Sequence, residues 1–260
     1  MLTALASYRL ITHDLTRSLS TTAAKPRVAL EAEYYLEHIE QVKSIDDFLA
    51  DDRVFAFAMK AHGLDDMTYA KAFMRKVLTE GIDNKSSFAN GLVDPRYKQF
   101  AETFNFARFG TTTTIFESTR QGTVDRYVRQ TLEEDAGQDN EGVRLALYFA
   151  RKASNITSPY GILADAALLK VAQTALGIPA AASAMTIEQQ AALITERLDL
   201  EDLQDPEKLE SLLGRFASLW ELENPTSTTA SPTVLFAQPV EAGIGSDLLA
   251  SLQNLRLGGN

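Results

Sequence analysis

Apolar residues recur at intervals of three and four along most of this chain, the spacing that places them on one face of a helix. Residues 123–135 illustrate the pattern, since Val124, Tyr127 and Val128 fall on a common face. Alternation typical of a strand is convincing only in TVLFAQPV, residues 233–240. The pattern therefore predicts an all-α protein built as a helical bundle.

Two stretches of the chain are similar to each other. Residues 48–64 read FLADDRVFAFAMKAHGL and residues 162–178 read ILADAALLKVAQTALGI, at an offset of 114 positions. The identical residues are Leu49, Ala50, Asp51, Ala58, Ala61 and Gly63, which match Leu163, Ala164, Asp165, Ala172, Ala175 and Gly177. We therefore expect a tandem duplication of a four- to five-helix unit, with a first repeat at 1–110, a second at 111–224 and a tail at 225–260. The alternative is coincidence, because alanine-rich helices that begin with Leu-Ala-Asp align easily in unrelated proteins.

Residues at the ends of the two copies predict where helices start and stop. Ser44 can accept a free backbone amide proton, and Asp47 completes a capping box. In the second copy Ser158 is followed by proline, which suits a first helical position. Gly63 and Gly177 follow at the other ends, where helices commonly finish in a left-handed residue. Each copy is therefore expected to be one capped helix running from the serine to the glycine.

Three more helix starts can be read in the same way. Asp-Pro pairs at 94–95 and 205–206 each combine a capping residue with a proline in the first turn. Thr186 and Gln189 have the spacing of a capping box.

The N-terminal segment is predicted to be helical over residues 3–22, and a second helix is expected over 27–42, after Pro26. One face of the first helix has residues at alternating spacings of three and four: Leu5, Tyr8, Thr12, Leu15 and Leu19, of which Thr12 is polar and fits a seam poorly. This spacing fits a coiled-coil seam or an ordinary amphipathic helix on the surface of a domain. The segment is too short to distinguish the two.

The C-terminal region differs in composition from the rest. Residues 223–233, ENPTSTTASPT, are rich in Pro, Ser and Thr and are expected to form a linker. A short apolar helix, SDLLASLQNLRL, is predicted after it, with a stripe formed by Leu248, Leu249, Leu252 and Leu255. Because so short a helix is marginal in water by itself, the stripe is expected to dock on this protein's own core or on a partner.

Charge and composition narrow the class of protein. The 260 residues carry a formal net charge of −10, which argues against a nucleic-acid-binding surface. Cysteine is absent, so disulfides, thiolate nucleophiles and cysteine-bound metals are excluded. No apolar run reaches the roughly 18–20 residues of a membrane span. The N-terminus lacks the apolar core of a secretory signal, so we expect synthesis in the cytoplasm, with any export proceeding without a cleaved signal.

The residue types that carry chemistry form no recognisable motif. His13, His38 and His62 lie in different predicted helices without ligand spacing, and are expected to face solvent. The acidic group Asp46, Asp47, Asp51 and Asp52 could suggest a site for a hard cation, but acidic residues also favour helix starts. We favour the structural interpretation of this group. No catalytic, cofactor-binding or metal-binding residue is predicted, and no cofactor is expected.

Several blocks of the sequence, taken in order, carry a family resemblance. They are SYRLITHDLTRSL, EYYLEHIEQVKSIDDFLADDRVFAFAMKAHGLDDMTYAKAFMRKVLTEGI, DPRYKQFAETFNFARFG, QGTVDRYVRQTLEEDAGQDNEGVRLALYFARKA, ITSPYGILADAALLKV and DLEDLQDPEKLESLLGRF. Together they resemble an alphaproteobacterial family known as domain of unknown function twelve-seventeen, whose genes typically lie in flagellar clusters. The family defines no catalytic residues, so the resemblance implies a flagellum-linked setting and no site.

These observations lead to a functional expectation with two alternatives. The first is a non-enzymatic structural or accessory protein of flagellar assembly or motility, with flagellar proteins as partners and a location at the flagellum after export. The second is a cytoplasmic adaptor or regulator that binds flagellar components. The third is an enzyme whose site is assembled from residues distant in sequence.

Overall fold

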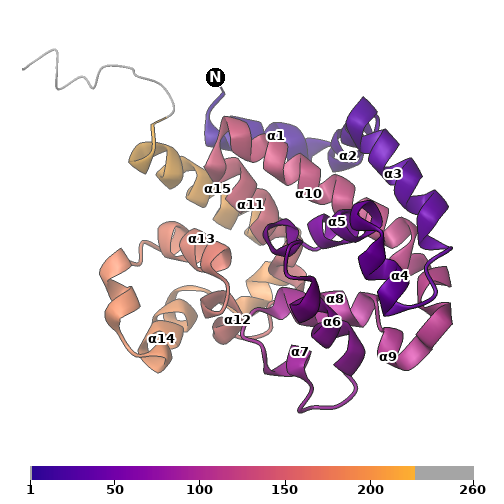
Figure 1. Ribbon diagram of the computed structural model, residues 1–260. Helices are drawn as coiled ribbons and strands as arrows, with labels where there is room; N and C mark the ends of the chain where they lie inside the picture. The colour runs from indigo at the N-terminus through magenta and orange to yellow at the C-terminus, as the bar shows by residue number, and fades with distance from the viewer. Residues whose placement is uncertain (1, 226–260) are drawn as a thin grey trace, which may run out of the picture. The chain divides into compact units, whose positions relative to one another are not determined.

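Helices account for all the regular structure in residues 2–225, which are the residues that the computed structural model describes (Figure 1). The all-α prediction is confirmed for this range, which contains no strand. The strand-like segment 233–240 and the leucine stripe Leu248, Leu249, Leu252 and Leu255 lie outside the described residues. No helix within 2–225 is both long enough and apolar enough to cross a membrane.

The α-helices are α1 (Ala4–His13), α2 (Leu15–Ala23), α3 (Pro26–Ile39), α4 (Ile45–Ala50), α5 (Asp52–Ala61), α6 (Lys71–Glu80), α7 (Phe88–Gly91), α8 (Pro95–Thr103), α9 (Phe106–Phe109), α10 (Gln121–Asp139), α11 (Glu141–Lys152), α12 (Pro159–Leu163), α13 (Ala166–Leu176), α14 (Ile187–Arg197) and α15 (Pro206–Glu223). Short 3-10 helices connect them: η1 (Asp65–Met67), η2 (Gly110–Ile115), η3 (Glu117–Thr119), η4 (Ala153–Asn155), η5 (Ala180–Ala184) and η6 (Leu200–Gln204).

The stretch 48–64 lies on two helices, so the prediction of one helix from Ser44 to Gly63 is wrong. Ser44 does start α4, where its hydroxyl accepts from the Asp47 amide. Asp51 then takes an extended conformation, and its carboxylate accepts from the amides of Arg53 and Val54 at the start of α5. A side chain that caps a new helix favours a break at that position over a continuous helix.

The second copy is also split in two. Ser158 is at the N-cap position of α12, which begins with proline, but its side chain makes no capping hydrogen bond. Asp165 starts α13 by accepting from the amides of Ala167 and Leu168. The interpretation of Asp51 and Asp165 as residues that begin helices is confirmed.

Other cap predictions hold. Aspartates at 94 and 205 cap α8 and α15, each with proline in the first turn. Thr186 and Gln189 form a reciprocal capping box at α14. Gly63 and Gly177 have φ angles of 69° and 63°, a conformation that side chains disfavour and glycine adopts freely.

The N-terminal segment is also divided, and the prediction of one helix over 3–22 is wrong. Asp14 separates α1 from α2 and caps α2 by accepting from the Arg17 amide. Ala4 and Tyr8 of α1 are buried against the helices of residues 143–217, whereas Leu19 of α2 packs against the core formed by residues 28–128, which includes α10. The apolar face of residues 3–22 therefore packs within this protein, partly on the first core and partly on the second.

Residues Met1–Asn224 form one compact unit that contains two hydrophobic cores. The first extends from Val28 to Phe106 and includes side chains of α10. The second extends from Val143 to Ala217 and includes side chains of α1. Helices α10 and α11 pack against each other between the cores, with α10 on α5 and α11 on α13 and α15 (Figure 1).

The first core is rich in aromatic rings. The ring centroid of Phe48 lies 4.9 Å from that of Phe104 and 5.7 Å from that of Phe55. All three side chains are almost completely buried, and burial of each contributes about 1.5–3 kcal/mol of stability.

The predicted tandem duplication and its boundary between 110 and 111 stay predictions, because two cores in one compact unit do not establish a repeat.

A close approach between α11 and α15 gives a first test of the packing. A Cβ atom at Gly142 would lie 2.3 Å from Cδ1 of Trp220, which is far inside van der Waals contact. We expect Gly142→Ala to lower the free energy of unfolding by about 1–3 kcal/mol, because the indole must shift. Denaturant unfolding followed by circular dichroism measures the change.

Gly161 in α12 supplies the matched control. No atom lies within 4 Å of a Cβ placed there. Gly161→Ala should keep the stability or raise it by up to about 1 kcal/mol, because alanine favours the helix. Equal losses in the two variants would contradict the assigned contact with Trp220.

Candidate functional site

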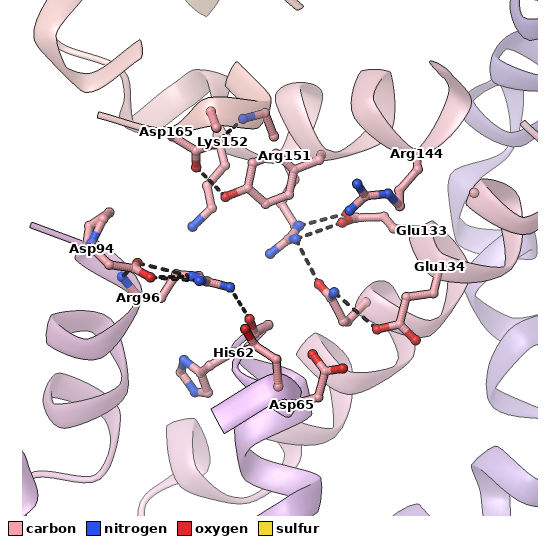
Figure 2. Close-up of a pocket in the computed structure, with 18 of the residues that line it drawn as sticks. His62, Asp65, Asp94, Arg96, Glu133, Glu134, Arg144, Arg151, Lys152 and Asp165 are labelled. Carbon is pink, nitrogen blue, oxygen red and sulfur yellow. Dashed lines mark hydrogen bonds and ion pairs between the residues drawn. The ribbon is translucent and has the colours of Figure 1, made fainter. Parts of the chain in front are cut away.

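A polar cleft of about 860 Å³ opens where segments of both cores face each other (Figure 2). Its lining comes from the end of α5, η1, the start of α8, the C-terminal half of α10, helix α11 and the start of α13. The ionisable residues that line it are His62, Asp65, Asp66, Asp94, Arg96, Glu133, Glu134, Glu141, Arg144, Tyr148, Arg151, Lys152 and Asp165. Such convergence of charged groups makes this cleft the candidate site.

Glu133 is the most deeply buried acid of the cleft, with its side chain 2% exposed. Its carboxylate accepts from Nε of Arg129 at 2.9 Å and from Nε and Nη2 of Arg151 at 2.8 and 2.7 Å. Arg151 also donates to Oε1 of Gln130 at 3.2 Å. Two guanidinium groups compensate the buried negative charge, and the bonds to Arg151 fasten α10 to α11.

Arg96 forms a second ion pair at the start of α8. Its guanidinium bonds both oxygens of Asp94 and donates through Nη1 to the backbone carbonyl of Gly63. Burial acts to raise the pKa of Asp94, but the hydrogen bonds and charge of Arg96 outweigh it and leave that pKa below its ordinary value. This pair connects the start of α8 to the turn after α5.

A tyrosine–aspartate hydrogen bond occurs on the side of α13. The Tyr148 hydroxyl donates to Oδ2 of Asp165 at 2.6 Å, while Oδ1 of that aspartate caps α13. Burial, and then the bond to the aspartate, raises the pKa of Tyr148 above its ordinary value. Away from the cleft, the Tyr34 hydroxyl donates in the same way to Asp51 at 3.2 Å.

The structure separates the three histidines and changes the interpretation of one of them. His13 is exposed, and His38 stacks on Tyr34 with 3.8 Å between ring centroids. His62 is largely covered, contrary to the prediction that it faces solvent. Its ring meets the edges or faces of Phe100 and Phe104, and its Nε2 atom is buried with no hydrogen-bond partner among residues 2–225.

Burial lowers the pKa of His62 to about 3, and the nearby cations Arg126, Lys152 and Arg151 act in the same direction. The ring is therefore neutral at physiological pH. Across the part of the chain that the structure describes, no three His, Asp or Glu side chains are arranged to hold a metal ion.

Each of the four aspartates at 46–52 has a partner within the described residues. Asp46 pairs with Arg75 and Asp52 pairs with Lys71. Asp47 accepts from the Lys43 amide beside the Ser44 cap, and Asp51 caps α5.

Sequence reasoning did not find Glu133, Arg151 or Lys152. The spacing of Arg129 and Glu133 is that of a helical ion pair and could have marked this part of α10. Nothing local marks the pairing of Glu133 with Arg151, because 18 residues and a helix boundary separate them. The predicted docking stripe Leu248, Leu249, Leu252 and Leu255 lies beyond the described residues and stays a prediction.

The buried acid gives a second test. Glu133→Gln keeps the shape of the side chain but removes the charge that compensates Arg129 and Arg151. We expect a loss of about 3–5 kcal/mol in the free energy of unfolding, because two partly buried guanidinium groups lose their counterion. Denaturant unfolding measures it.

Glu141 provides the control, since it lines the same cleft and pairs with Arg144 at a side-chain exposure of 46%. Glu141→Gln should change stability by no more than about 1 kcal/mol. A similar small effect for Glu133→Gln would show that the Glu133 pairs contribute little to stability.

His62 predicts a dependence of stability on pH. Its folded pKa of about 3 lies below the ordinary value of 6.5, so between those pH values the unfolded chain binds a proton that the folded protein does not. As pH falls through this window, His62 should therefore remove up to about 1.4 kcal/mol of stability per pH unit. The His62→Gln variant should lose stability less steeply between about pH 6.5 and pH 4.

The same measurement on His13→Gln serves as the control, because His13 is exposed. That variant should keep the slope of the unmodified protein. Parallel curves for His62→Gln and the unmodified protein would contradict a buried, neutral His62.

Comparison with known proteins places the chain in a family. A crystal structure of protein AGR_C_984 from Agrobacterium tumefaciens is similar over 86% of this chain and 98% of that chain, with 49% sequence identity and a TM-score of 0.79. No curated protein matches this chain. The family model described as "Protein of unknown function (DUF1217)" matches residues 61–209, more than half of the chain, which includes most of the cleft. The chain therefore belongs to the DUF1217 family.

Proposed function

We propose that this protein is a non-enzymatic structural or accessory factor of bacterial flagellar assembly or motility. The setting rests on the family resemblance, since genes of this family typically lie in flagellar clusters. The non-enzymatic role rests on the pairing of cleft residues with one another. Glu133 of α10 bonds Arg151 of α11, Tyr148 of α11 bonds Asp165 at the start of α13, and Arg96 of α8 bonds Asp94 and Gly63.

The observation that carries the proposal is the environment of Glu133. A buried carboxylate is a common general acid or base, but such a group must exchange a proton with a substrate. Glu133 is bonded to two guanidinium groups through both of its oxygens, an arrangement that occupies the carboxylate and fixes α10 against α11. Two further paired acids, Asp94 and Asp165, also cap helices. The cleft therefore resembles a joint between helices more than a reaction centre.

We also propose that the helical body is a tandem duplication, which would suit a factor that engages a repeating assembly. The two tyrosine–aspartate bonds support it, because each joins residues 17 positions apart, Tyr34 to Asp51 and Tyr148 to Asp165. The offset between the bonds is 148 − 34 = 165 − 51 = 114, the offset found in the sequence. Each aspartate also caps the helix that begins directly after it.

A second function is favoured by a different observation. Phe109, Ile115 and Phe116 are exposed to 40%, 56% and 38%, and the two aromatic rings meet edge to face with centroids 4.8 Å apart. An exposed apolar group of this kind suits a contact with another protein. It supports the alternative role of an adaptor or regulator that binds flagellar components in the cytoplasm.

The location of the protein tests the proposal. In the native host, we expect deletion of the gene to reduce the swimming zone in soft agar, and expression of the protein to restore it. We also expect the protein in purified flagella or culture supernatant of a strain with a working flagellar export gate, and its absence from those fractions in a strain without the gate.

Protein confined to the cytosol of both strains would contradict export and favour the adaptor. Recovery of flagellar proteins in a pull-down from the cytosol would then support that second role. Normal motility of the deletion strain, with no flagellar protein recovered, would overturn both functions.

A further inference from the structure

Lys152 differs from the other cations that line the cleft. Arg96, Arg144 and Arg151 each form an ion pair with an acidic side chain. Lys152 forms none within residues 2–225; its ammonium donates to the neutral Oε1 of Gln99 at 3.0 Å. A partly buried positive charge is normally paired with an anionic group. The ammonium of Lys152 has no such ion-pair partner among the described residues, so it requires a counterion.

Neighbouring positive charges increase that requirement. Arg151 precedes Lys152 on α11, and Figure 2 shows the side chains of Lys152 and Arg96 extending toward the middle of the cleft. Burial, followed by the positive charge of Arg151, lowers the pKa of Lys152. Arg96 acts in the same direction, whereas the carboxylates of Asp165 and Glu133 act in the opposite direction without restoring the ordinary pKa. A further anion beside Lys152 would raise this pKa, as those two carboxylates do.

The space beside Lys152 is large enough and polar enough for a ligand group. The cleft has a volume of about 860 Å³, and its lining includes the positively charged Arg96 and Arg151. Each guanidinium carries five N–H donors, more than its bonds to carboxylates use, so both can assist in binding an oxyanion.

The surrounding charges limit the kind of anion. The acids that line the cleft are Asp65, Asp66, Asp94, Glu133, Glu134, Glu141 and Asp165, against the cations Arg96, Arg144, Arg151 and Lys152. This excess of acid repels every anion, and it repels a group with several negative charges more strongly than a singly charged one. A single carboxylate supplies the one negative charge that Lys152 lacks, and it accepts hydrogen bonds from lysine and arginine in the usual geometry.

We propose that this cleft binds a carboxylate group as the counterion of Lys152, with Arg96 and Arg151 as neighbouring donors. The carboxylate belongs either to a small organic acid or to an acidic side chain of a protein partner. The bound carboxylate would connect α11 to the start of α8. It would thereby stabilise the packing of the first core against the second.

Titration with acetate tests the proposal on the full chain. Lysine side chains labelled with carbon-13 report binding at the ε-carbon, and the Lys152 signal is identified by its loss in Lys152→Gln. At constant ionic strength, with chloride replaced by acetate, we expect a saturable shift of this signal and a rise in the pKa of Lys152.

Three variants make the test specific. Two of them lack the Lys152 signal, so the rise of the unfolding temperature with acetate concentration measures binding in all three and in the unmodified protein. Lys152→Gln should weaken acetate binding about tenfold or more, which corresponds to loss of one charge-assisted contact. Lys152→Arg should retain most of the binding, because it keeps the positive charge. Lys98→Gln, a change of the same charge at an exposed position of α8, should bind acetate as the unmodified protein does. Thermal unfolding verifies that each variant is folded.

Blocked tripeptides Gly-Asp-Gly and Gly-Asn-Gly distinguish the two sources of carboxylate. Tighter binding of the aspartate peptide than of acetate, with none of the asparagine peptide, would support an acidic side chain of a partner. Binding of acetate alone would support a small organic acid. The proposal would be overturned if neither acetate nor either peptide produced a saturable shift of the Lys152 signal. It would also be overturned if Lys152→Gln bound acetate as tightly as the unmodified protein.

Discussion

The carboxylate of Glu133, buried between Arg129 and Arg151, is the interaction on which the middle of this structure depends. Removing a carboxylate from water is costly, and only compensating charge with good hydrogen-bond geometry offsets the loss. Glu133 meets that condition with one guanidinium from its own helix and one from α11. Because α10 packs on the first core and α11 on the second, this one cluster fastens helices that belong to different cores. The same requirement for compensation explains why Lys152, one residue beyond Arg151, stands out.

The side chains of the cleft hold helices in place and are also arranged to bind a ligand group. Its paired groups restrict the helices that carry them, because Asp94 caps α8 while bonded to Arg96, and Asp165 caps α13 while bonded to Tyr148. These side chains each have two partners, so their positions are well determined. Rigid surroundings of this kind favour binding of a ligand group without much loss of conformational entropy. A carboxylate held by Lys152 would extend the existing pattern, in which every other cation of the cleft has an acidic counterpart, and it agrees with a factor that acts by contact with other proteins.

The residues of the repeated stretch illustrate how local signals translate into structure. Asp51 and Asp165 were readable as helix starters, and both cap helices. Their capping also breaks the single helix that the apolar periodicity implied. The spacing of apolar residues is nearly the same on both sides of a one-residue interruption, so periodicity alone does not reveal the break. The same reason explains the division at Asp14. Periodicity thus located helical regions well, and cap residues inside those regions decided how many helices each contained.

The sequence by itself determined the all-α class, the caps at Ser44, Asp94, Thr186 and Asp205, and the glycines that follow α5 and α13. These features depend on interactions over a few residues, which is why periodicity and capping chemistry could predict them. Only the tertiary structure decided which charges meet. Glu133 and Arg151 are 18 residues apart, and Gly63 and Arg96 are 33 apart. Burial likewise made His62 a neutral ring against Phe100 and Phe104, whereas a histidine without ligand spacing in a predicted helix was expected to face solvent. Electrostatic compensation acts through space, and helix packing sets those distances.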